Sequence, residues 1–221
     1  MDRELASFER ALKSIEDVFG RGAVPIQLPI GEEKNFRGLI DLVAMKAHIY
    51  KPAEAGDGKP AIEEIPADLA GAAQAAHEKL VEMVAEGDDK LMEEFFEKGT
   101  LPAEDLLPGL REAVQEKRIF PVLVSSALRN IGSASLLNFL VDVFPSSAAR
   151  GKWTGYPQPG GKGDPVERKI ADSEPLSIYV FKTLADPFAG RITYFKVMTG
   201  VLKNDATLAN FNRQKIGRAH V

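Results

Sequence analysis

Hydrophobic periodicity divides the first fifty residues into one helix and a β-rich region. Apolar residues recur at spacings of three and four up to Gly20, which predicts a core-facing helix. Residues 24–30 then alternate between apolar and other positions, and a second β-rich stretch covers 38–50 after a turn around Gly31. We expect these two stretches to pair as antiparallel strands. The apolar positions of the helix are Leu5, Phe8, Leu12, Ile15 and Phe19.

Three further helices are expected in the middle of the chain. Residues 51–66 are rich in proline and glycine and predict an exposed excursion. From Ala67 a helical stripe begins, a second helix covers 88–98 and ends at Gly99, and a third follows. The stripes consist of Leu69, Ala73, Ala76, Leu80 and Val84 in the first helix, and Leu106, Leu110 and Val114 in the third.

The second half changes from an α/β pattern to an all-β pattern. Residues 119–124 form a continuous apolar run, typical of a buried parallel strand, and 133–144 predict the helix that follows it. Residues 146–175 have no hydrophobic period and are dense in proline, glycine and charge, which indicates a domain boundary. Three alternating stretches between 176 and 211 then predict the start of an all-β domain.

Composition narrows the class of protein. The chain has 221 residues, 44% apolar and 27% charged, so it is long enough for two domains with separate cores. A net charge of −4 argues against nucleic-acid binding by a general basic field. The lack of cysteine fits a reducing compartment and excludes thiolate zinc sites. No apolar run reaches a membrane span and the start is too charged for a signal peptide, so we expect a cytoplasmic protein without a membrane partner.

Few residues suggest chemistry. His48, His77 and His220 lack metal-binding spacing, and no phosphate-binding loop, nucleophile elbow or dinucleotide fingerprint occurs. Motif reasoning therefore yields no catalytic residue and no metal site. One arrangement is informative: a predicted parallel strand leads into Ser126, Ala127 and Leu128, at the strand end where open α/β sheets bind ligands. Asp2, directly before the first helix, occupies the other place where a guanine pocket needs a polar group.

Five segments together resemble bacterial elongation factor G, the translational GTPase that drives translocation of tRNA and mRNA on the ribosome. The resemblance covers about residues 1–213. It implies an α/β fold: the C-terminal part of a P-loop GTPase domain with an inserted α+β subdomain, followed by the start of an all-β barrel domain. The segments are MDRELASFERAL, AVPIQLPIGEEKNFRGLIDLVAMKA, LVEMVAEGDDKLMEEFFEKGTL, FPVLVSSALRNIG and FKTLADPFAGRITYFKVMTGVLKND.

This resemblance implies a division of the chain into domains. The wide sequence separation of Asp2 and Ser126, compared with that in small GTPases, leaves room for the insert. The final residues IGRAHV resemble a translated sequencing adapter, so we set the tail aside. The expected parts are 1–24 with 118–146 as the remainder of the GTP-binding domain, 25–117 as the insert, 147–175 as a linker, 176–213 as the start of the barrel, and 214–221 as a non-native tail.

The resemblance also assigns a guanine site. The family motif reads Asn-Lys-Met-Asp, and Met1 and Asp2 match its second half, so we expect the chain to begin inside the motif. Asp2 would then accept hydrogen bonds from guanine N1 and N2, the Ala127 N–H would donate to O6, and Ser126 and Leu128 would shape the loop. The phosphate-binding loop, switch regions and Mg²⁺ ligands belong upstream, so this fragment would bind the base of GTP or GDP without hydrolysing GTP.

Two surfaces are candidates for ribosome contacts in a monomeric factor. Acidic helix residues would face the ribosomal stalk protein, and basic residues of the β-domain would face ribosomal RNA; solvated charge is the alternative for each. Another translational GTPase, of release factor three or ribosome-protection type, and a non-enzymatic ribosome-docking module stay open, as does the paralogue, translocation or recycling. The acidic set is Glu82, Glu86, Asp88, Asp89, Glu93 and Glu94, and the basic set is Lys182, Arg191, Lys196 and Lys203.

Overall fold

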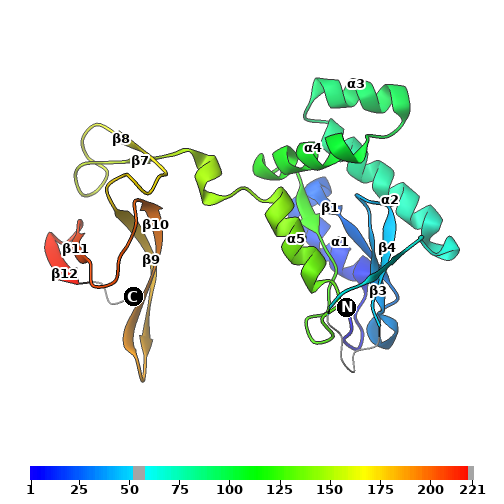
Figure 1. Cartoon of the computed structure of the whole chain (residues 1–221), viewed down its shortest axis with the longest axis horizontal. Coiled ribbons are helices and arrows are strands. Elements are labelled where there is room, and N and C mark those ends of the chain that lie inside the picture. The colour runs from blue at the N-terminus through cyan, green and yellow to red at the C-terminus, as the bar shows by residue number, and fades with distance from the viewer. Residues whose placement is uncertain (52–57, 219–221) are drawn as a thin grey trace. The chain divides into compact units, whose positions relative to one another are not determined.

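The chain folds as a mixed α/β protein with several small sheets (Figure 1). The computed structural model describes residues 1–51 and 58–218. The chain divides into two compact units, Met1–Phe144 and Pro145–Val221.

The first helix starts later and is more exposed than its apolar pattern predicts. Helix α1 covers Phe8–Phe19 because Ser7, in extended conformation, caps it with a side-chain oxygen that accepts from Arg10 N. Leu5 precedes the cap with φ +62° and is 74% exposed. No residue of α1 is buried, which corrects the expectation of a core-facing helix. Only one face is covered in part, the face formed by Phe8, Leu12 and Ile15.

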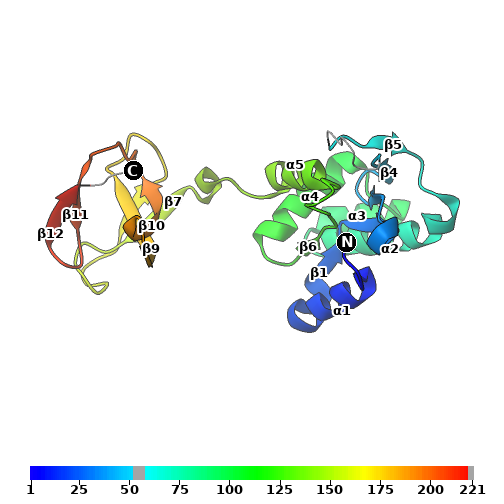
Figure 2. The same cartoon turned by 90° about the horizontal axis from the view of Figure 1, so that it is seen from below.

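A parallel strand pair lies beside α1. After the short helix η1 (Gly20–Gly22), strand β1 (Ala23–Pro25) pairs in parallel with β6 (Phe120–Val122). Figures 1 and 2 both show β1 next to α1. Helix α5 (Ser133–Val143) follows β6, so the predicted parallel strand and its following helix are confirmed. All three β6 residues are half-buried, whereas the sequence pattern predicts a fully buried strand.

An antiparallel sheet and three helices lie between β1 and β6 in sequence. Strands β2 (Gln27–Ile30), β3 (Gly38–Asp41) and β4 (Lys46–Ile49) pair in order, so the predicted antiparallel pairing is confirmed for β2 with β3. Each of the two predicted strands is divided in two, and β1 belongs to a different sheet. The short helix η2 (Glu33–Asn35) lies in the β2–β3 connection. In the expected excursion, residues 52–57 lie outside the described part, and Ala61–Glu63 form the edge strand β5.

All three predicted middle helices are present: α2 (Ala67–Ala85), α3 (Asp89–Lys98) and α4 (Ala103–Gln115). Asp88 caps α3 through its carboxylate, which accepts from two backbone N–H groups, and Gly99 ends it in left-handed conformation with φ +72°. Apolar faces of α2 and α4 pack on the sheet to form the largest core cluster (Figure 1). Its fully buried members include Ile40, Leu80, Val81, Leu106 and Leu110.

In its described residues, the second unit contains three two-stranded antiparallel sheets. They form no barrel, because each strand pairs only with its neighbour in sequence, and the expected start of a barrel domain stays a prediction. The expected linker contains the helix η3 (Ser147–Arg150) and a hairpin closed by a Lys152–Glu167 ion pair of 2.7 Å. Part of the expected non-native tail forms a strand of the third sheet. The pairs are β7 (Lys152–Gly155) with β8 (Val166–Lys169), β9 (Ser177–Asp186) with β10 (Gly190–Thr199), and β11 (Thr207–Asn210) with β12 (Lys215–Arg218).

Candidate functional site

The loop that follows β6 is closed on itself. Ser126 N donates to Ile131 O at 2.9 Å, and Ile131 N donates back to Ser126 O at 3.0 Å. Inside this closure, Arg129 N donates to Ser126 Oγ at 3.2 Å. At Gly132, where φ is +77°, a Cβ would lie 2.7 Å from Val124 O, so only glycine fits the turn into α5. We call residues 125–131 the Ser126 loop.

Asp2 lies beside this loop in the structure, although the two are far apart in the sequence of the first unit. The Met1 amino group donates to Ser125 O at 2.9 Å, across a sequence separation of 124 residues. A hydrogen bond from the Ser126 side chain holds the pKa of Asp2 below its usual value, and the Asp2 backbone and the positive charge of Arg129 act in the same direction. The Asp2 side chain is 13% exposed. An ionised acceptor therefore lies beside a buried hydroxyl.

Ala127 and Leu128 lie on the outer side of the Ser126 loop, and both are exposed. Leu128 is 90% exposed and packs against no core cluster. Within residues 1–51 and 58–218, no group accepts a hydrogen bond from Ala127 N–H, although Ala127 O accepts from Asn130 N at 3.3 Å. One backbone donor of the loop is therefore available to a ligand.

Residues 31–36, which we call the η2 loop, hold both parts of this site. Oε1 of Glu32 accepts from Phe8 N at 2.6 Å, and Oε1 of Glu33 accepts from Leu5 N at 2.7 Å. Glu33 N donates to Met1 O at 3.0 Å. From the other side, the Arg129 guanidinium donates to the carbonyls of residues 34 and 36 at 3.3 and 3.1 Å. Motif reasoning missed this loop, whose only sequence signal is two adjacent glutamates after a glycine turn.

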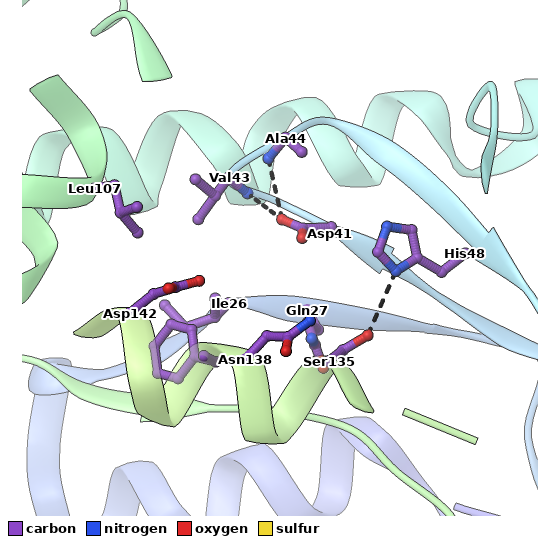
Figure 3. A pocket seen from close by; sticks show the side chains of 11 residues that line it. Ile26, Gln27, Asp41, Val43, Ala44, His48, Leu107, Ser135, Asn138 and Asp142 are labelled. Atoms are coloured by element: carbon purple, nitrogen blue, oxygen red, sulfur yellow. Dashed lines mark hydrogen bonds between the residues drawn. The ribbon is translucent and has the colours of Figure 1, made fainter. Parts of the chain in front are cut away.

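A cavity of about 260 Å³ lies between α5 and the strands β2 to β4 (Figure 3). Its apolar wall is formed mainly by Ile26, Val43, Leu107 and Phe139. Motif reasoning missed this cavity too, because its residues come from separate elements that only the fold brings together. Its polar residues are Gln27, Asp41, His48, Ser135, Asn138 and Asp142.

The histidines take structural roles. His77 is buried, with Nδ1 2.7 Å from Leu42 O and Nε2 3.2 Å from Thr100 Oγ1. His48 Nδ1 lies 3.5 Å from Ser135 Oγ, and His220 lies outside the described residues. In the described part of the chain, no three histidine or carboxylate side chains are grouped so that they could hold a metal ion. Across those same residues, no helix has the length and apolar character that a membrane crossing needs.

The charged residues predicted as ribosome contacts are mostly exposed. Glu86 pairs with Arg21 at 2.8 Å, Glu94 pairs with Lys98 at 2.5 Å, and Asp88 caps α3. Three of the six acidic residues therefore also have local structural roles. The other acidic residues, Glu82, Asp89 and Glu93, and the basic residues Lys182, Arg191, Lys196 and Lys203 are exposed.

Comparison with known proteins supports the fold and names no activity. No protein-family model matches the sequence. Among solved structures, a crystal structure of a Thermus thermophilus protein is similar, with a TM-score of 0.66 and 27% sequence identity. The similarity covers 91% of this chain and 27% of that protein's chain. The present chain thus spans about a quarter of the length of its structural relative, and the two share a mixed α/β arrangement.

Proposed function

We propose that this chain is part of a translational GTPase of the elongation factor G type and recognises the guanine base of GTP and GDP. The observation that carries the proposal is the meeting of Asp2 with the Ser126 loop across 124 residues of sequence. The proposal extends the sequence resemblance, which assigns these same residues to guanine recognition.

The chemistry of the site fits guanine. An ionised Asp2 carboxylate accepts hydrogen bonds from N1–H and the N2 amino group, and the free Ala127 N–H donates to O6. Adenine carries the opposite polarity at these positions, so it would leave both protein groups unpaired, which a hydrogen-bonding site penalises strongly. Ser126 supports this arrangement because its hydroxyl keeps Asp2 ionised and also accepts from Arg129 N. Leu128 shapes the exposed edge of the loop.

We assign GTP hydrolysis to residues outside these 221. The 221 residues contain no phosphate-binding loop, and the described residues hold no group of side chains that fits Mg²⁺. We therefore assign base recognition to this chain and GTP hydrolysis, with its metal ion, to a longer protein that includes it. The exposed acids of α2 and α3 would contact the ribosomal stalk protein, and the exposed bases of β9 and β10, together with Lys203, would contact ribosomal RNA.

The test replaces one oxygen atom of the Asp2 carboxylate. Asp2→Asn, in the longer protein that carries the phosphate-binding loop, replaces a carboxylate oxygen by an amide donor. Affinity for GDP should fall at least about tenfold, because N–H groups would then face each other. Xanthosine diphosphate has a carbonyl in place of the amino group, so its affinity should rise. Nucleotide titrations of both proteins measure the two affinities.

The matched control is Asp17→Asn, which removes an exposed carboxylate of α1. If Asp2→Asn lowered the affinity for both guanosine and xanthosine diphosphate, the substitution would have destabilised the protein in general. An unchanged ratio of the two affinities in Asp2→Asn would mean that Asp2 only supports local structure, and the proposed guanine site would be wrong.

A further inference from the structure

A side-chain amide with an unused donor lines the cavity between α5 and the β2–β4 strands. Gln27 is 3% exposed, and its Oε1 accepts from Val124 N at 3.3 Å. Throughout the described residues, no group accepts a hydrogen bond from the Gln27 NH₂, and the residue lines the cavity (Figure 3). Among the described residues, the only fully buried side-chain polar atom without a partner is Arg118 Nη1, so the Gln27 NH₂ is reached from the cavity and can donate to a ligand there.

Two carboxylates face the same cavity from different elements. Asp41 Oδ1 accepts from Val43 N at 2.9 Å and Ala44 N at 3.0 Å, which fixes the carboxylate and leaves its second oxygen toward the cavity (Figure 3). Asp142 extends into the cavity from α5 (Figure 3). Neither carboxylate has an ion-pair partner among the residues that the structure describes.

Among the described residues that line the cavity there is no lysine or arginine to neutralise these carboxylates. The nearby Arg111 donates to the Asp142 main-chain oxygen, through Nε at 2.9 Å and a terminal nitrogen at 2.6 Å, and forms no ion pair with its carboxylate. The lining is therefore negatively charged at neutral pH, and a cation is the ligand that complements it.

The size and the apolar wall of the cavity favour an organic cation over a metal ion as its ligand. In the described residues, no three metal-ligating side chains are grouped here or elsewhere. The cavity of about 260 Å³ has room for a molecule on the order of ten non-hydrogen atoms, smaller than a drug-sized ligand. Ile26 and Phe139 offer buried apolar surface to a hydrocarbon stem.

We propose that this cavity binds a small organic cation that carries a guanidinium group and one carbonyl or hydroxyl oxygen. Asp41 and Asp142 hold the cationic end, the Gln27 NH₂ donates to the oxygen, and the apolar wall packs against the stem. This site is separate from Asp2 and the Ser126 loop, so it does not depend on the proposed guanine recognition.

Calorimetric titration of the full chain with L-argininamide tests the proposal. This probe has a guanidinium, a short stem and a carbonyl oxygen. L-citrullinamide is its matched control, because both compounds carry the same α-ammonium and a neutral urea replaces only the guanidinium. We expect saturable binding of L-argininamide and at least about tenfold weaker binding of L-citrullinamide, since a charged hydrogen bond is lost. Asp142→Asn and Asp41→Asn should each weaken L-argininamide binding to a similar extent.

The variants are chosen so that the fold is preserved. In Asp41→Asn, the side-chain amide oxygen still accepts from the two turn N–H groups. Asp142 is exposed on α5, so Asp142→Asn keeps the test valid if Asp41→Asn unfolds. Asp17→Asn, remote from the cavity lining, should leave the affinity unchanged. Absence of saturable binding, equal affinity for the two probes, or equal affinity of Asp142→Asn and Asp17→Asn would each overturn the proposal.

Discussion

Arg129, a residue of the Ser126 loop, connects this loop with the η2 loop in the candidate guanine site. Its backbone N–H donates to Ser126 Oγ, and its guanidinium donates to two carbonyls of the η2 loop. Its positive charge also lowers the pKa of Asp2. Because its hydrogen bonds join the Ser126 loop to the η2 loop, Arg129 is a positioning residue for the site, and it does not need to touch the base.

We expect Arg129→Met to loosen the Ser126 loop without unfolding the chain. The methionine keeps an apolar stem but removes the donors that reach the η2 loop, so amide hydrogen exchange should accelerate in residues 126–131. If the proposed function is correct, affinity for GDP in the longer protein should fall by roughly five- to tenfold, from the loss of hydrogen bonds to a charged group. Arg129→Lys should recover only part of the affinity, because lysine lacks the planar fork.

The control for this prediction is Arg3→Met, which removes an exposed guanidinium near Asp2 that contacts neither loop. Equal exchange rates and equal affinities in Arg129→Met and Arg3→Met would contradict the positioning role.

At the scale of elements, the approach of α4 to its neighbours depends on a residue without a side chain. A Cβ at Gly109 would lie 2.6 Å from Val84 Cγ1 and 2.8 Å from Leu91 Cδ1. Both distances are shorter than carbon atoms tolerate, so α4 reaches α2 and α3 only because position 109 is glycine. Gly71, on the exposed side of α2, has no atom within 4 Å of its virtual Cβ.

These two glycines predict opposite effects on stability. Gly109→Ala should destabilise the chain by about 1–3 kcal/mol, because the added methyl overpacks a filled interface. Gly71→Ala should stabilise it by about 0.5–1 kcal/mol, because alanine loses less backbone entropy in a helix. Urea unfolding of both variants measures the difference, and a shift of both midpoints in the same direction would refute the packing argument.

The β9–β10 turn depends on a carboxylate that must be ionised. Asp186 Oδ1 accepts from Phe188 N at 2.8 Å and Ala189 N at 2.7 Å. The Ala189 and Phe188 N–H groups hold the pKa of Asp186 below its usual value of 3.8. A lowered pKa in the folded state means that the ionised carboxylate stabilises the turn.

We therefore expect the turn to weaken as the solution is acidified. The stabilisation is complete above the unfolded pKa of about 4 and is lost as the pH falls through the lower folded value. NMR of the Phe188 and Ala189 amides should show a chemical-shift change with this pKa, and lower protection from exchange, relative to the intrinsic rate at each pH, at the acid end. In Asp186→Asn this pH dependence should disappear. If it persists there, another group is responsible for it.

Regular elements were predictable where local signals agree, as in α3, whose helical period ends at Gly99. Helix α1 starts after the first apolar residue of its pattern, Leu5, because the Ser7 side chain can cap a helix and that of Leu5 cannot. Strand β5 and the β7–β8 hairpin lie in segments rich in proline and glycine, where periodicity carries little information. Asp2 and Ser126 were identified through a family resemblance. The η2 loop and the cavity depend on contacts between distant segments, which local patterns do not encode.

At the scale of the whole chain, the two units differ in how much apolar surface they bury. Every buried apolar side chain of the described residues lies in the unit Met1–Phe144. In the described part of the unit Pro145–Val221, the one buried side chain is Thr199, and Phe188 is 100% exposed. Since burial of apolar surface is the main source of stability, the first unit should be the more stable.

Native-state hydrogen exchange should therefore show its strongest protection in residues 25–117. These residues contain most of the largest core cluster, whereas β9 and β10 pair only with each other. Amides of residues 176–208 should exchange faster, through local opening of the hairpin. Stronger protection of 176–208 than of 25–117 would contradict this distribution of stability.

The parallel pairing of β1 with β6 determines the order in which the molecule can assemble. The adjacent Gln27–Val124 contact closes a loop of 97 residues, and its entropy cost exceeds that of a ten-residue loop by about 2 kcal/mol. Neighbouring strands β2, β3 and β4 close much shorter loops, so they should form first and bring the distant ends together. The Ser126 loop then completes its contacts last, and a ligand that binds it would report that the unit Met1–Phe144 is fully folded.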